Sequence, residues 1–123
     1  KNGNSIFVFE TEGLCVGHLG HLHHYPDDAQ FAALGRLDVV MAPVDGGLTL
    51  DQPTMIRLLQ RLKSSVVIPM HWFSIYSLDQ FLAGMADDFD IETDAGTSLE
   101  VSLRTLPDRP TVMVLRPAYL DAE

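Results

Sequence analysis

The sequence predicts an α/β protein built on a mixed β-sheet. Apolar runs of strand length alternate along the chain with helically spaced stretches of about 10 to 15 residues, and a hairpin signal precedes them. The apolar runs lack regularly alternating polar residues, which is typical of strands covered on both faces. Together these observations favour a sheet with helices packed against it.

Strand signals occur at six places along the chain. Glu12 and Gly13 predict the turn of an N-terminal β-hairpin, because they separate two short apolar segments. Pro69 is expected to end the strand in SVVIPMHWF, since proline cannot donate to a sheet ladder. The predicted strands lie within residues 5–10, 14–19, 37–44, 65–73, 87–103 (two short strands joined by a turn) and 111–117.

Three helices are predicted between these strands. Asp27 or Asp28 is a good N-cap for a short helix that ends near Gly35. Asp51 begins the clearest helix, DQPTMIRLLQRLKSS, in which apolar residues recur on one face. A third helix is expected from Ser77 onward. Since no repeat, low-complexity tract or linker occurs, residues 1–123 are expected to form a single unit.

Composition narrows the class of protein. A chain of 123 residues with 46% hydrophobic and 20% charged residues has the balance of a globular domain. Its net charge of −9 repels phosphate backbones, so we expect neither nucleic acid nor a membrane surface as a partner. The single cysteine, Cys15, favours a cytoplasmic location. The chain begins without methionine and runs almost at once into a strand, as a piece of a longer protein would.

Histidines are concentrated in one segment that follows a predicted strand. The stretch GHLGHLHHYPDD holds four of the five histidines of the chain: His18, His21, His23 and His24. Neutral imidazole is the commonest protein ligand for zinc, so a metal site is one interpretation. A histidine-rich surface loop with adventitious metal affinity, or histidines packed in a core, are the alternatives. Adjacent histidines point in different directions, so one or two ligands are expected from this segment.

Two further residues follow the ends of predicted buried strands. His71 comes after VVIPM, and Asp45 follows MAPV. Covered α/β sheets gather their sites at one edge, so His71, Asp45 and the histidine segment are expected to share a site. A structural role is the alternative for both residues. Asp38, at the start of its apolar run, is expected to be a strand-edge residue. The chain has no GxSxG, CxxC, P-loop or GxGxxG motif.

Three stretches, in this order and at this spacing, resemble the C-terminal half of metallo-β-lactamase-fold hydrolases, in the branch that includes the ascorbate-phosphate lactonase. The resemblance implies one half of an αββα sandwich: a mixed sheet with helices on one face. It covers about residues 2–72. The stretches are NSIFVFETEGLCVGHLGHLHH, LDVVMAPVDGG and VVIPMHW.

The resemblance also implies metal ligands. His71 matches the last metal histidine of the family, and His18 matches the histidine of its HLGD stretch. His21 stands where the family has an aspartate that bridges two metals; an imidazole cannot bridge in this way, so one ion is expected rather than two. His21, His71 and His18 are therefore the predicted metal ligands. His23, His24 and Asp45 are assigned to supporting or substrate-binding roles, and no catalytic residue is assigned.

The family's HxHxDH motif, which lies in its N-terminal half, does not occur in this chain. The resemblance therefore implies a hydrolase that is active only when that half is supplied. Its metal-bound hydroxide would attack a small-molecule ester, lactone, amide or phosphate. The expected ion is zinc, or else manganese or iron, and this fragment alone is not required to hold it.

A sheet face meant for the other half needs a partner. The N-terminal half of the same domain or a second copy, in a homodimer, is expected there. The alternative function is a non-catalytic, self-associating α/β fragment without a complete metal site. A small metal protein of the cupin type is disfavoured, because cupins are nearly all β.

Overall fold

The chain is represented by a computed structural model, which describes residues 7–19, 25–44, 51–70, 75–93, 96 and 101–115. All statements about the structure concern these residues. Within them, no helix has the length and apolar character needed to cross a bilayer.

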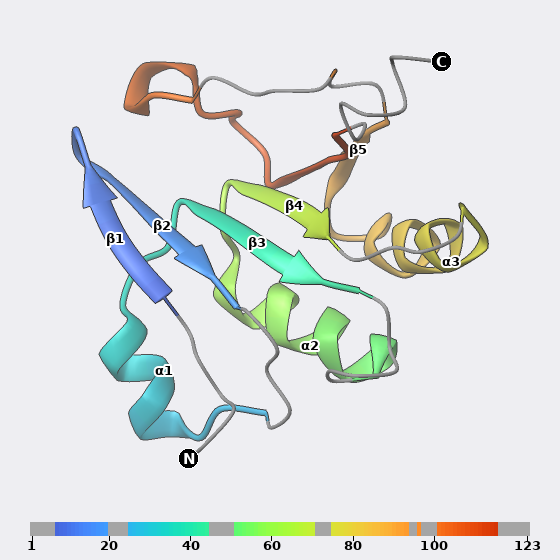
Figure 1. Ribbon diagram of the computed structural model, residues 1–123, viewed down its shortest axis with the longest axis horizontal. Coiled ribbons are helices and arrows are strands. Elements are labelled where there is room, and N and C mark those ends of the chain that lie inside the picture. The colour runs from blue at the N-terminus through green and yellow to red at the C-terminus, as the bar shows by residue number, and fades with distance from the viewer. Residues whose placement is uncertain are drawn as a thin grey trace.

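A six-stranded mixed sheet forms the centre of the fold, with the strand order β1-β2-β3-β4-β6-β5. β1 runs antiparallel to β2, whereas all the other neighbouring strands are parallel, so the arrowheads of β2, β3 and β4 point in one direction in Figure 1. The prediction of a mixed sheet is confirmed. The strands are β1 Phe7–Thr11, β2 Leu14–His18, β3 Val39–Pro43, β4 Val66–Met70, β5 Asp90–Glu92 and β6 Thr111–Met113.

The predicted N-terminal hairpin is present. Thr11 pairs with Leu14, which leaves Glu12 and Gly13 as a two-residue turn with φ of 51° and 86°. Positive φ at both central positions is the feature of the type I′ turn, whose twist matches that of the flanking strands.

Three helices connect the parallel strands: α1 Asp28–Leu34, α2 Gln52–Leu62 and α3 Ile75–Met85. Asp27 caps α1 as predicted, because its carboxylate accepts the N–H of Gln30 at 2.8 Å while the Gln30 side chain accepts the N–H of Asp27 at 2.8 Å. Asp51 occupies the N-cap position of α2, although its side chain makes no capping hydrogen bond. α3 begins two residues before the predicted start.

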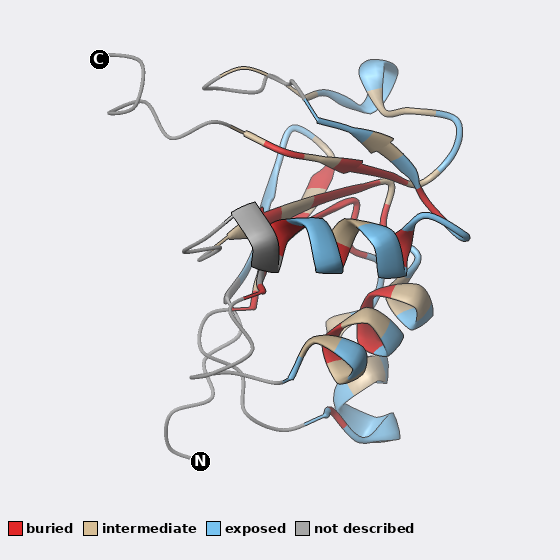
Figure 2. Ribbon diagram, turned by 90° about the vertical axis from the view of Figure 1, so that its right-hand side faces the viewer, coloured by how far each residue is buried: buried red, intermediate tan, exposed pale blue. Residues whose placement is uncertain are grey.

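All three helices lie on one face of the sheet, as predicted (Figures 1 and 2). The core between the layers is formed by β-strand residues such as Val40 and Val67, which have no exposed surface, and by apolar residues of the helices. The helical residues buried in this core are Met55, Leu58, Leu59, Phe81 and Met85.

The opposite face of the sheet is covered in part by residues 101–106. Val101 and Leu106 pack against a second apolar cluster, which consists of Leu14, Val16, Val39 and Val66. The prediction of a second strand within 87–103 is wrong for its described part. Residues 101 and 102 are not in a strand, and Leu103–Thr105 forms a 3-10 turn, in which Ser102 N–H donates to Thr105 Oγ1 at 2.9 Å.

Pro69 does not end its strand, contrary to the expectation: β4 continues to Met70. Val66 N–H donates to the carbonyl of Asp38, just before β3, and the Met70 carbonyl accepts from Val44 N–H, just after it. Alternate residues from Val66 therefore direct their backbone groups toward β3. Pro69 is out of phase with these residues and faces β6, where the pairing register ends at Val67. The missing N–H therefore removes no bond of the observed ladder.

Candidate metal centre

Three adjacent parallel strands end at the same edge of the sheet. β2 ends at His18, β3 at Pro43 and β4 at Met70. The strand ends are held together by backbone hydrogen bonds: Leu19 N–H donates to the Met41 carbonyl at 3.0 Å, and Val44 N–H donates to the Met70 carbonyl at 2.9 Å. Ligand sites in parallel sheets lie outside such carboxyl ends.

His18 is the predicted ligand that the structure describes. It is the last residue of β2, pairs with Met41 and is half-buried. Because paired residues project on the same side of a sheet, its side chain belongs to the face that carries Met41 and Ile68, opposite the helices. The backbone of β2 and β3 thus fixes the base of this side chain.

The other nominated residues lie outside the described part of the chain: His21, His23, His24, Asp45 and His71. Asp45 directly follows Val44 in the sequence, and His71 directly follows Met70. Among the described residues, no group of three or more His, Cys, Asp or Glu side chains is placed to hold a metal ion. Imidazole nitrogen is a donor that suits zinc, and an ion bound at His18 would need further ligands from outside the described residues.

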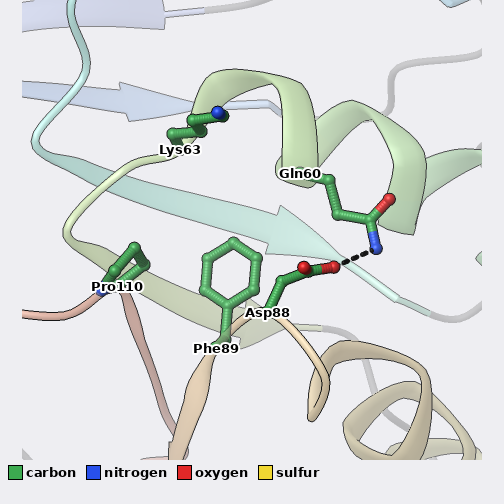
Figure 3. Close-up of a pocket in the computed structure, with 5 residues that line it drawn as sticks. All are labelled: Gln60, Lys63, Asp88, Phe89 and Pro110. Atoms are coloured by element: carbon green, nitrogen blue, oxygen red, sulfur yellow. Dashed lines mark hydrogen bonds between the residues drawn. The ribbon is translucent and has the colours of Figure 1, made fainter.

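A pocket at the opposite, amino edge of the sheet was not predicted. It has a volume of about 450 Å³ and is lined by residues from the end of α2, from the turn before β5 and from the residue before β6 (Figure 3). These residues are separated in sequence and share no motif, so no sequence signal brings them together. They are Gln60, Lys63, Asp88, Phe89 and Pro110.

The fold and the location of His18 define a class: α/β proteins in which one sheet carries helices on a single face and a histidine at its carboxyl edge. Residues 1–71 match the family model described as "Beta-lactamase superfamily domain". The chain belongs to this superfamily.

Similarity to a solved structure supports the same superfamily assignment. The chain is similar to a protein from Thermotoga maritima named as a candidate Zn-dependent hydrolase of the metallo-β-lactamase superfamily, with a TM-score of 0.73 and 33% identity. The similarity covers 89% of this chain and 58% of that protein.

Named sequence relatives agree with this assignment. A UPF0173 metal-dependent hydrolase of Carboxydothermus hydrogenoformans is 25% identical over 81% of this chain and 41% of its own length. One from Pyrococcus furiosus is 31% identical over 57% of this chain and 32% of its own length. The chain thus spans less than half the length of these relatives. They carry no indication of the lactonase branch, which stays a prediction.

Proposed function

We propose that this chain is the C-terminal half of a metal-dependent hydrolase that acts on a small molecule containing an ester, lactone, amide or phosphate bond. The observation that supports this most directly is the alignment of three strand ends at one edge. His18 lies at the first end, and Asp45 and His71 are within one or two residues of the other two. The names of the relatives support metal dependence.

In this proposal His18, His21 and His71 hold one ion, with zinc as the first choice. When bound, the ion supplies Lewis-acid chemistry, polarising the scissile group and lowering the pKa of water. The chain's own contribution is positional, because the β2–β3 ladder fixes His18 and the β3–β4 ladder fixes the residue before His71. His23, His24 and Asp45 are assigned to orienting ligands or substrate.

Metal content tests the proposed ligands. After exhaustive dialysis, elemental mass spectrometry of the 123-residue chain should find about one zinc per chain, the loading of a single mononuclear site. His21→Ala and His71→Ala should each lose the zinc, whereas Asp87→Ala, at an exposed residue before β5, serves as the control. Metal retained in all three variants would contradict the proposed ligand set.

Activity tests the completion of the site. Ester, lactone, amide and phosphate substrates should be hydrolysed when the chain is mixed with a segment that contains an HxHxDH motif, and not by the chain alone. His71→Ala should abolish this activity. Activity that is unaffected by this substitution would refute the role of His71.

We also propose that the sheet face opposite the helices receives a partner, either the N-terminal half or a second copy. Phe9, paired with Val16 on this face, is 51% exposed, and Met41, Ile68 and Met113 are half-buried there. Apolar surface of this kind favours association. This surface also supports the second candidate function, a self-associating fragment without a complete metal site.

Light scattering separates the two candidates. A dimer that contains no metal and stays inactive when the N-terminal segment is added would favour the self-associating fragment. A chain that gains activity on forming a one-to-one complex with that segment would favour the hydrolase. Phe9→Ser should weaken either association, because its side chain lies on the proposed contact face.

A further inference from the structure

The pocket at the amino edge is separate from the proposed metal centre. Its residues adjoin the first residues of β5 and β6 and the last turn of α2, whereas His18, Val44 and Met70 lie at the carboxyl ends of the strands. A volume of about 450 Å³ is within the range of small-molecule sites. Ligand binding in this pocket therefore does not require the proposed metal centre.

Opposite charges line this pocket without pairing with each other. Gln60 Nε2 donates to Asp88 Oδ2 at 2.7 Å, which holds the Asp88 carboxylate in place (Figure 3). Within the described part of the chain, no side chain or backbone group donates to Asp88 Oδ1. Lys63 forms no ion pair with any described residue. Each charge is thus available to a bound molecule.

The backbone that carries these groups is well anchored. Lys63 has a left-handed conformation with φ of 53°, and its N–H donates to the Leu59 carbonyl at 3.0 Å. The N–H of Phe89 donates to the Met85 carbonyl at 3.0 Å, and that of Asp90 to the Pro110 carbonyl at 2.9 Å. The site is therefore largely preformed, which lowers the entropy cost of binding.

An apolar wall accompanies the two charges. Half-buried Pro110 lines the same pocket, and behind it lies Phe89, a core residue that is only 3% exposed. A simple anion would be attracted by Lys63 but repelled by Asp88, and a simple cation would be attracted by Asp88 but repelled by Lys63. A molecule that carries both charges and an apolar group satisfies all these surfaces.

We propose that this pocket binds a small zwitterion of the amino-acid type. Its ammonium group is held by Asp88 and its carboxylate by Lys63, and its apolar side chain lies against Pro110.

The test is a ligand titration of the 123-residue chain, monitored through its amide NMR chemical shifts. L-Leucine should produce saturable shifts at Lys63, Asp88 and Phe89 at concentrations up to about 20 mM, where a millimolar site is filled. The carboxylate-only probe 4-methylpentanoate and the amine-only probe 3-methylbutylamine should bind up to about fivefold more weakly, the loss expected for one exposed charge contact.

Matched variants identify the groups responsible. Asp88→Asn and Lys63→Met should each weaken leucine binding by about fivefold. Asp87→Asn, a change at the adjacent exposed carboxylate that does not line the pocket, should leave binding unchanged. The amide spectrum of each variant verifies its fold. Absence of saturable shifts, equal affinity for the three probes, or unaltered binding in both pocket variants would overturn the proposal.

Discussion

The carboxylate of Asp38 accepts a hydrogen bond of 2.9 Å from the backbone N–H of Cys15, across the junction of β2 and β3. The Asp38 N–H donates in return to the Cys15 carbonyl at 2.8 Å. Arg36 Nη2 lies 3.0 Å from the same carboxylate oxygen, and this hydrogen bond together with the Asp38 charge raises the pKa of the guanidinium. Asp38 thus joins two strands at the edge opposite the candidate metal centre.

Removing this carboxylate should destabilise the fold. Asp38→Ala leaves the part-buried Cys15 N–H without its side-chain acceptor, so we expect a loss of about 1–3 kcal/mol in the free energy of unfolding. The ion pair with the largely exposed Arg36 adds little to this loss. Urea denaturation measures this loss. Asp38→Asn should lose less stability, because its amide oxygen can still accept the hydrogen bond from Cys15 N–H. Exposed Asp108→Ala is the control, and an equal effect at both positions would contradict the role of Asp38.

Replacing Ser64 by alanine should stabilise the protein. The Ser64 hydroxyl is buried, with the residue 1% exposed, and it has no hydrogen-bond partner among the residues that the structure describes. Since a buried unpaired hydroxyl is costly, its removal should raise the free energy of unfolding by about 1 kcal/mol. Urea midpoints of Ser64→Ala and of half-buried Ser65→Ala provide the comparison. A loss of stability in Ser64→Ala would show that the hydroxyl is needed.

The contact between α2 and α3 predicts a coupled pair of substitutions. Alanine in place of a mid-helix glycine normally raises the free energy of unfolding by about 0.5–1 kcal/mol. At Gly84, however, the added Cβ would lie 2.5 Å from Ile56 Cδ1, so Ile56 must move. Gly84→Ala should therefore raise the free energy of unfolding less in the wild type than in an Ile56→Val background, where that methyl group is absent. A double-mutant cycle by urea denaturation checks this, and additive effects would contradict it.

Arg61 should hold α1 against α2. Its Nη2 lies 2.8 Å from Asp28 Oδ1, and its Cζ lies 3.8 Å from the centroid of the Phe31 ring. The hydrogen bond to Asp28 also raises the pKa of Arg61. In Arg61→Met the amides of α1 should exchange hydrogen several-fold faster while those of α2 are unchanged. Arg57→Met is the control on the same helix. Similar exchange rates of the α1 amides in the two variants would contradict the role of Arg61.

Much of the fold could be predicted because its signals are local. The two-residue turn at Glu12 and Gly13, the Asp27 cap and the apolar face of α2 each depend on residues that are close in sequence. The predictions for Pro69 and for residues 101–103 are wrong for the opposite reason. Whether a proline disrupts a ladder, and whether an apolar segment pairs or packs, depends on neighbours that are distant along the chain.

The sequence by itself determined the fold class, the order of its main elements and the chemistry available in the histidine segment, since patterning and residue type act over a few residues. Only the tertiary structure decided that β2, β3 and β4 end at one edge, that Asp38 joins two strands, and that Lys63 and Asp88 line one pocket. Each of these features depends on segments that are distant in sequence and are brought together by sheet pairing and helix packing. These segments meet because the apolar core is buried only when the strands and helices pack against one another.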